Sequence, residues 1–379
     1  MMSTMMSRPI VSKLRMSPRR MFSLAVTAAF LLMFLPLLVS PALAGRHEYA
    51  FEEKRTISLE PGTSITVQNI SGHIDVRGWD GDHIGVTTTK RVKAGSREEA
   101  QEWAEKIEII IEKNGPELFI EAKRPRDWTE SLESLLEGIF QKKPSANVDF
   151  EIDTPRDVHL EISSVSGDIS VRDIIGEVNI DVVSGDMELL DIGSDVSINA
   201  ISGDMVIEEV SGNLDVAAVS GDSRLQNIGG HVHIDVTSGD IIAESVDGDL
   251  YIDGTSGDVS ATDIYGNINI DVTSGDIHVV QQAGELSIDT SSGDVTVETA
   301  LIKAGSYTVE TSSGQITFRV PSDASSTIDM ETSGGRITAK LPMTIESMSR
   351  THLVGTLGDG EGEIVLSTSG GDIDLLPSD

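Results

Sequence analysis

The tripeptide Ser-Gly-Asp recurs at an interval of eighteen residues without a slip. It first occurs at Ser166-Gly167-Asp168, and its Gly returns at positions 185, 203, 221, 239, 257, 275 and 293. A second Gly follows nine residues after most of these, with Ser194 as the exception. The unit is therefore a nonapeptide used twice in each eighteen-residue coil. Fixed self-similarity of this length indicates a solenoid, in which each repeat packs only on its neighbours.

The apolar residues between the tripeptides alternate as short strands require. With each Gly as position zero, positions +2, +4, +7, +11 and +13 are almost always apolar, and β-branched residues dominate. In the first coil these are Ile169, Val171, Ile174, Val178 and Ile180, and the seventh coil places Gln282 at +7. This pattern predicts an all-β fold, a parallel β-solenoid with two main faces, right-handed by the crossover rule. We expect Gly to supply the positive φ at both corners.

Position +16 leaves two arrangements open. It holds Val183, Ile201 and Val219 in the early coils, but Thr237, Thr255, Thr273 and Ser291 in the later ones. Either the interior becomes more polar along the chain, or the strand turns position +15 inward instead.

The regular repeat divides the chain into four regions. Residues 45–124 predict a small β-rich N-terminal cap, with one helix over Ser96–Lys106 and a hairpin turning at Asn114-Gly115. Residues 125–146 form an insertion, in which apolar residues at helical spacing predict a helix over Thr129–Gln141. Residues 147–379 form the solenoid, whose coils become irregular after Ala300 and close its C-terminal end. Residues 1–44 precede these regions.

Residues 1–44 resemble a secretory signal peptide. Five basic residues precede an apolar run from Met21 to Val39, and Ala42-Leu43-Ala44 then forms a small-x-small cleavage signal. An uncleaved membrane anchor is the alternative, because about nineteen apolar residues can span a bilayer. We expect an exported protein in the periplasm, the cell envelope or the medium.

Charge and composition exclude several partners. The chain carries 62 acidic and 28 basic residues, and only Arg172 and Arg224 are basic among residues 157–298, against 29 acidic residues. A phosphate backbone needs the opposite sign, so we expect no nucleic-acid partner. The chain has no Cys, which excludes disulfides and thiolate chemistry. A protein or a cell-surface glycan is the expected partner, and membrane contact is expected only through the signal segment or the Thr129–Gln141 helix.

Two groups of residues are candidates for metal binding. The stacked Asp residues of the tripeptides repel one another, and calcium would relieve this, but calcium-binding nonapeptide turns contain more glycine than this unit. We instead expect each Asp to accept N–H bonds within its own turn. His231 and His233 point to the same side of one strand, with Asp215 and Asp249 in the neighbouring coils. We expect solvated surface there, so no metal site and no cofactor is assigned.

Catalytic motifs are missing from the sequence. It has no Gly-x-Ser-x-Gly elbow, no His-Glu-x-x-His and no phosphate-binding loop. A polysaccharide lyase would need basic residues and long loops, which the regular coils lack. We therefore expect no enzyme and no catalytic residue.

Four features of the sequence resemble the DUF4097 group of β-strand repeat proteins. They are Gly72–Val76 followed by Gly78-Trp79-Asp80-Gly81-Asp82, Thr89–Val92 leading into the Glu98-Glu99-Ala100 helix, the Ser-Gly-Asp coils, and Gly360–Ile364. Members are classed by their architecture as adhesins, and some are linked to envelope-stress regulation. The resemblance implies a β-solenoid and supplies no catalytic residues. Trp128–Lys143 is an addition to the group's pattern.

Together these observations predict a non-catalytic, adhesin-like or structural protein of the cell envelope. The alternative is an envelope-stress sensor or regulatory module that acts through a partner protein, with the Thr129–Gln141 helix as its docking element. A carbohydrate-active β-helix enzyme is the less favoured alternative.

The signal sequence yields a direct prediction. Mass spectrometry of the exported protein should give Gly45 as the first residue, because the small residues at Ala42 and Ala44 fit the peptidase pocket. Changing Ala44→Phe should block this processing, whereas Ala50→Ser, beyond the cleavage site, should leave it intact. Recovery of an N-terminus upstream of Met21 would contradict the prediction.

Overall fold

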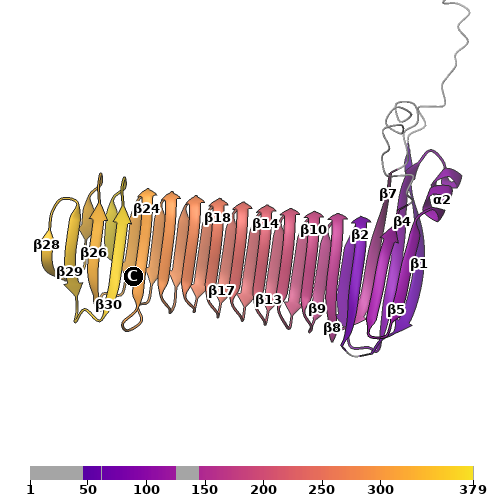
Figure 1. The fold of residues 1–379 in the computed structure, drawn as a ribbon, viewed down its shortest axis with the longest axis horizontal. Coiled ribbons are helices and arrows are strands. Elements are labelled where there is room, and N and C mark those ends of the chain that lie inside the picture. Colours follow the sequence, from indigo (N-terminus) through magenta and orange to yellow (C-terminus); the bar gives the residue numbers. More distant parts are fainter. Residues whose placement is uncertain (1–45, 61, 125–144, 379) are drawn as a thin grey trace, which may run out of the picture. The chain divides into compact units, whose positions relative to one another are not determined.

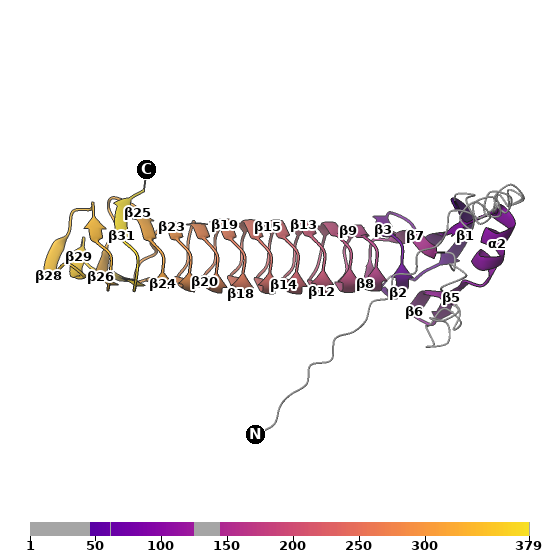
Figure 2. The same ribbon diagram turned by 90° about the horizontal axis from the view of Figure 1, so that it is seen from above.

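The computed structural model describes residues 46–60, 62–124 and 145–378, and these form one compact unit that begins at His47. The predicted signal peptide and the predicted Thr129–Gln141 helix lie outside the described residues. Within the described residues no helix is long and apolar enough to cross a membrane. Two long sheets make up almost all of this unit, and Figure 2 shows them as facing layers.

One sheet, called sheet A, contains the strands that follow each Ser-Gly-Asp corner. Within the described residues it has fifteen strands, in the order β1 (His47–Ser58), β4 (His83–Ala94), β7 (Ser145–Pro155), β3 (Ile74–Trp79), β9 (Ile169–Ile174), β11 (Met187–Ile192), β13 (Met205–Val210), β15 (Ser223–Ile228), β17 (Ile241–Val246), β19 (Val259–Ile264), β21 (Ile277–Gln281), β23 (Val295–Thr299), β25 (Ile316–Val320), β31 (Ile373–Pro377) and β27 (Ile337–Ala339).

The other sheet, sheet B, contains the strands that lead into each corner. Its sixteen described strands run in the order β28 (Thr344–Met348), β29 (His352–Leu357), β26 (Ser326–Thr332), β30 (Gly362–Thr368), β24 (Ser306–Ser313), β22 (Leu286–Ser292), β20 (Ile268–Ser274), β18 (Leu250–Ser256), β16 (Val232–Ser238), β14 (Leu214–Ser220), β12 (Val196–Ser202), β10 (Val178–Ser184), β8 (Val158–Ser166), β2 (Thr63–Ser71), β6 (Glu117–Lys123) and β5 (Glu108–Asn114).

The regular strands are parallel and stack in a uniform register (Figure 1). Met187 of β11 lies beside Ile169 of β9 and Met205 of β13, so paired residues occupy the same position of successive repeats. The apolar residues predicted to face inward are buried between the sheets. Their continuous packing explains why no single coil is stable alone.

Of the two arrangements considered, the one that turns position +15 inward is correct. Val182, Ala200, Ala218, Val236 and Val272 are buried, whereas the +16 residues beside them point outward. Gly254 and the buried Thr290 occupy position +15 in the two remaining coils. The change from Val and Ile to Thr at position +16 therefore affects only the outer surface of sheet B.

The two glycines of each repeat serve different purposes. Gly at position zero has φ between 131° and 147° from Gly167 to Gly293, as predicted. The second Gly has no positive φ in most coils, so the prediction of a positive φ there is wrong. A Cβ on Gly248 would lie 2.4 Å from the carbonyl oxygen of Gly230, so glycine is needed there for close approach of two coils.

The first half of most coils also contains one residue whose backbone is in the left-handed region, and this residue is not glycine. Position +6 has φ between 56° and 62° from Asp173 to Asp263, including Glu209 and Ser245. This conformation inserts an extra outward residue, so that +7 again faces inward after +4. The kink is missing at β21, where Gln281 rather than Gln282 pairs with Ile264. The prediction that Gln282 faces inward is therefore wrong, and Gln281 is buried in its place.

The stack begins earlier than its regular repeats. β2 and β3 are joined by Ser71-Gly72-His73, and they pair in parallel with β8 and β9. The helix α2 (Arg97–Glu105) matches the prediction, and Ser96 caps it by accepting the Glu99 N–H at 3.2 Å. Ala100 and Ala104 of α2 are buried. The hairpin of β5 and β6 turns at Gly115, as predicted.

The C-terminal coils do not stack in chain order. β30 lies between β24 and β26 in sheet B, and β31 lies between β25 and β27 in sheet A. The last strands of the chain are thus inserted one coil before the end, and antiparallel β26, β29 and β28 close sheet B. The irregular region does form the end of the stack, but by insertion and not by successive addition.

The corner glycines should tolerate no side chain. A Cβ on Gly221 would lie 2.0 Å from the carbonyl oxygen of Gly203, and the φ of 131° is itself strained for alanine. We expect Gly221→Ala to lower the free energy of unfolding by about 3 kcal/mol or more. Gly85→Ala is the control, since a Cβ there meets nothing within 4 Å. It should change stability by less than about 1 kcal/mol. Urea unfolding measures both, and equal losses would contradict the prediction.

Candidate functional site

The Ser-Gly-Asp corners carry a continuous ladder of side-chain hydrogen bonds. In each coil the Asp N–H donates to Oδ1 of the Asp in the preceding coil, as from Asp240 to Asp222 at 2.9 Å. The ladder includes Asp186, Asp204, Asp258, Asp276 and Asp294 and ends where Gln315 N–H donates to Asp294. The prediction that each Asp accepts N–H bonds within its own turn is wrong. The corner N–H groups point along the stack, so the acceptor lies in the neighbouring coil.

The carboxylates of this ladder also repel one another. At the strand spacing of about 4.8 Å, two unit charges in bulk water repel by about 0.9 kcal/mol before salt screening. Each hydrogen bond to a charged acceptor contributes about 1.5–3 kcal/mol. By these magnitudes, the hydrogen bond between two successive coils offsets the repulsion between their carboxylates.

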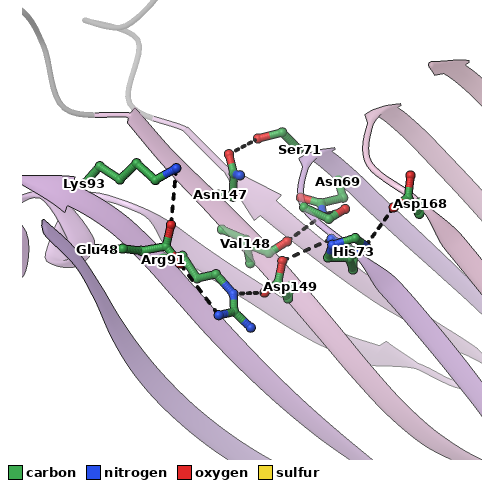
Figure 3. Close-up of polar contacts among 11 residues, drawn as sticks. Glu48, Asn69, Ser71, His73, Arg91, Lys93, Asn147, Val148, Asp149 and Asp168 are labelled. Carbon is green, nitrogen blue, oxygen red and sulfur yellow. Dashed lines mark hydrogen bonds and ion pairs between the residues drawn. The ribbon is translucent and has the colours of Figure 1, made fainter. Parts of the chain in front are cut away.

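The N-terminal end of the ladder is built differently (Figure 3). Asp149 of β7 accepts the His73 N–H at 3.1 Å, and the same carboxylate pairs with Arg91 of β4. This pairing raises the pKa of Arg91. His73 takes the place of the tripeptide Asp, and its Nδ1 lies 3.4 Å from Oδ2 of Asp168. The first carboxylate is thus neutralised by an arginine at the point where the regular coils begin.

A second ladder runs along the opposite corner, and the sequence analysis missed it. Position +10 follows the second Gly and holds Asp195, Asn213, His231, Asp249 and Asn267 in successive coils. Each side chain accepts the N–H of the next, as between Asp249 and Asn267 at 2.8 Å. The repeated Gly-Asp or Gly-Asn pair at this corner was the available signal.

The two histidines do not act together. His231 belongs to the second ladder, and its Nδ1 accepts the Asp249 N–H at 3.0 Å. His233 lies on the outer face of β16, in register with Asp215 and Tyr251. The Nδ1 lone pair of His231 accepts this hydrogen bond from the next coil, so it is not available to a metal ion. Within the described residues, no three His, Asp or Glu side chains are grouped so that they could hold a metal ion.

An apolar column runs along the outer face of sheet B beside the Ser-Gly-Asp corner. We call Ile70, Val165, Val183, Ile201 and Val219 the apolar column; they occupy position +16 of adjacent coils and are 38–52% exposed. Together with residues at position +14, which include Asp181 and Asp235, they line a groove of about 800 Å³. The column ends where Thr237 replaces the apolar residue. Such a row of exposed β-branched side chains is unusual for a solvated sheet face.

A second hollow surrounds the Gly78-Trp79-Asp80-Gly81-Asp82 segment. Trp79 donates from its indole N–H to the His83 carbonyl at 3.1 Å, and the two rings meet edge to face at 4.5 Å. Arg156 lies between Asp80 and Asp173. A hydrogen bond from His83 lowers the pKa of Asp82. These contacts fix the turn between β3 and β4, so the segment fits a structural role.

Comparison with known proteins identifies the family. The profile described as Toastrack DUF4097 matches residues 63–262 and 246–376, so the chain belongs to the DUF4097 family. A search of curated proteins gives no match.

Solved structures resemble the chain at low identity. A putative adhesin from Parabacteroides distasonis is 12% identical with a TM-score of 0.31, and the match covers 86% of this chain and 97% of that one. A putative cell adhesion protein from Clostridium sporogenes is 10% identical with a TM-score of 0.21, covering 87% and 100%. A putative lipid binding protein from P. distasonis is 13% identical with a TM-score of 0.28, covering 86% and 96%. Similarities this low transfer no function.

The hydrogen-bond ladder predicts how two substitutions of Asp222 change the stability of the protein. Asp222→Ala leaves the Asp240 N–H without its acceptor, but it also relieves the repulsion from two neighbouring carboxylates, so the net loss of stability should be about 1 kcal/mol. Asp222→Asn keeps an amide oxygen, as Asn213 does in the second ladder, and removes the repulsion from two neighbours. It should be as stable as the native protein or slightly more stable. Urea unfolding distinguishes them, and an Asn variant as weak as the Ala variant would contradict the assignment.

Calcium should leave the thermal midpoint unchanged. The Oδ1 atoms of the ladder already accept N–H bonds, so ion binding would have to compete with them. Thermal unfolding is measured in calcium and in a chelator, and the two midpoints are compared. Sodium at equal ionic strength is the control. A calcium-specific rise in midpoint would show a site that binds the folded state.

Proposed function

We propose that this DUF4097 protein is a non-catalytic, exported component of the cell envelope that presents an adhesin-like or structural surface. The observation that carries the proposal is the use of the corner side chains: both ladders commit their carboxylate, amide and imidazole groups to holding coils together. Groups committed in this way stabilise the stack and are poorly placed for proton transfer or nucleophilic attack. Family membership agrees with this interpretation.

The proposal includes the finer architecture. We infer right-handed winding, coils of eighteen residues, an N-terminal cap over residues 45–124 and an insertion over 125–146 that precedes the solenoid of 147–379. The expected partners are a protein or a cell-surface glycan. The strongly acidic regular coils favour partners with basic or neutral surfaces.

The regulatory alternative is favoured by the position of the insertion. The chain leaves sheet B at Lys123 and enters sheet A at Ser145, so residues 125–144 connect the two sheets and belong to neither of their described strands. A partner-docking element in such a connection would need no change in the coils. Recovering partners with the native protein, and with residues 125–144 replaced by a short Gly-Ser linker, distinguishes the two functions. Unaltered partner recovery would count against the regulatory alternative.

Cell fractionation and a glycan assay test the main proposal. The mature protein should appear in the periplasmic, envelope or extracellular fraction, with a cytoplasmic enzyme as the control for lysis. Incubation with cell-surface polysaccharides should release no reducing ends, whatever binding is seen. A mainly cytoplasmic protein would contradict the localisation, and measurable cleavage would contradict the non-catalytic assignment.

A further inference from the structure

The apolar column is a feature of the outer surface that the stack itself does not require. It crosses β2, β8, β10, β12 and β14, which are adjacent strands of sheet B (Figure 1). The same position holds Thr237, Thr255 and Thr273 in β16, β18 and β20, and these strands pair in the same register as the earlier ones. A coil therefore forms with Thr at position +16 as well as with Val or Ile. The exposed Val and Ile side chains are available for contacts outside the stack.

The groove beside the column is apolar along its length and acidic in charge. Ala200 and Ala218 line it from position +15, and Ala217 adds only a methyl group at position +14. The charged residues of its lining are Glu121, Asp181 and Asp235, and within the described residues no Lys, Arg or His lines it. A ligand that fits this groove presents apolar side chains to it and carries no negative charge beside them.

A row of carboxylates continues from the groove along the same face of sheet B. We call Asp235, Asp253, Asp271, Asp289 and Glu310 the acidic row; they pair in register on successive strands from β16 to β24 and all are exposed. Among the described residues, none of these five carboxylates is in an ion pair. Like charges directly opposite one another destabilise a sheet. A cationic ligand would relieve this repulsion.

The acidic row is not needed to build the strands that carry it. Asn199 and Ala217 occupy the same position in β12 and β14, which pair in the same way. Asp235 belongs both to the groove lining and to the row, so the two surfaces are continuous. Together they offer an apolar contact over the first coils and a negative one over the later coils.

The size and charge of this surface disfavour a second copy of the chain. The five side chains of the column are 38–52% exposed. They present on the order of 300 Å² of apolar surface, whereas a stable dimer buries about 800 Å² per partner. A second copy would also bring its own acidic coils, which carry 29 acidic against two basic residues over 157–298. An anionic membrane surface is disfavoured for the same electrostatic reason.

The spacing of the column matches one face of an α-helix. Successive residues of the column are about 4.8 Å apart. Residues three or four apart on a helix face are about 4.5–6 Å apart along the helix axis, so each coil meets one side chain. An extended strand places residues of one face about 6.8 Å apart and falls out of step within two coils. The column spans about 19 Å, which is the length of a helix of about thirteen residues.

We propose that the groove and the acidic row bind an amphipathic, basic helix of a partner protein. The apolar face of that helix packs on Val183, Ile201 and Val219, and its Lys or Arg side chains pair with Asp235 and the carboxylates that follow it. This deepens the proposed adhesin-like function, on which it rests, by naming the chemistry of the partner. The binding tests use the purified exported protein, so their failure is distinguishable from a failure of the fractionation or glycan tests.

A designed peptide tests the proposal directly. The probe is a fluorescent synthetic helix of about 20 residues, with Leu at every third or fourth position and Lys elsewhere. We expect it to bind at least about tenfold more tightly than a scrambled peptide of the same composition, because equal charge leaves only the apolar face to distinguish them. A peptide with Glu in place of Lys should not bind. Equal affinity of the ordered and scrambled peptides, or no binding of the ordered one, would overturn the proposal.

Threonine substitutions in the column locate the contact. Val183→Thr, Ile201→Thr and Val219→Thr together copy the residue that the later coils carry, so the stack should still fold. This variant should bind the Leu-Lys peptide at least about tenfold more weakly, since it removes the apolar contact and keeps every charge. Leu190→Thr with Val206→Thr is the matched control, because both side chains are exposed and apolar but belong to sheet A. Circular dichroism checks folding, and equal affinities of the two variants would overturn the proposal.

Neutral substitutions in the acidic row test the electrostatic part. Asp235→Asn, Asp253→Asn and Asp271→Asn together should weaken binding about tenfold at low salt and flatten its dependence on salt. The control removes three exposed charges from sheet A: Glu188→Gln, Asp191→Asn and Glu209→Gln. Equal effects of the two variants would show attraction to net charge alone and overturn the assignment.

The other occupants of the groove are outcomes of the same variants. Sedimentation of the native protein should show no dimer that the threonine variant abolishes. Vesicles of phosphatidylcholine, with and without phosphatidylglycerol, should bind the native protein and the threonine variant equally weakly. A dimer, or vesicle binding, that depends on the column would assign the groove to a second copy or to a membrane and overturn the proposal.

Discussion

The approach of one coil to the next at the Ser-Gly-Asp corner is the constraint on which the rest of this structure depends. The Gly Cα lies so close to the carbonyl of the Gly one coil earlier that a methyl group would overlap it. This contact lets the strands on both sides of the corner reach hydrogen-bonding distance together. The sheets, the buried apolar stripes and the side-chain ladders all follow from that spacing, which continues from Gly72 through Gly314 to Gly371 and Gly335.

The same spacing determines what the polar residues can do. A backbone N–H that turns out of the coil at a corner needs an acceptor about one strand spacing away, and a short side chain in the adjacent coil supplies it. Asp, Asn and His all serve at the second corner, which shows that an acceptor atom is required and a negative charge is not. The acidity of the stack therefore arises partly from a structural requirement that uncharged residues also meet.

The sequence predicted the two-sheet stack, the inward positions and the first helix, because strict periodicity leaves little choice of face. It did not reveal the acceptor of each Asp, since an Asp in a turn can bond its own backbone or a neighbour's with the same residues. The left-handed conformation at position +6 was also hidden, because Glu209 and Ser245 are not residues that favour it. The apolar column was visible as Val183, Ile201 and Val219, but only the burial of Ala200 and Ala218 showed which way the strand faced.

The threading of the last strands has a consequence for biosynthesis. As the chain is made from its N-terminus, each regular coil can add to the finished one before it as soon as it is complete. That simple growth stops at β25, because the place beside β24 and β25 belongs to β30 and β31, which are synthesised after β26 to β29. β26 must leave that place vacant, or be displaced from it, until β30 has been made. A chain stalled before Gly362 would thus present an open sheet edge at β24 and β25, so the stack stays incomplete until β30 and β31 have been made.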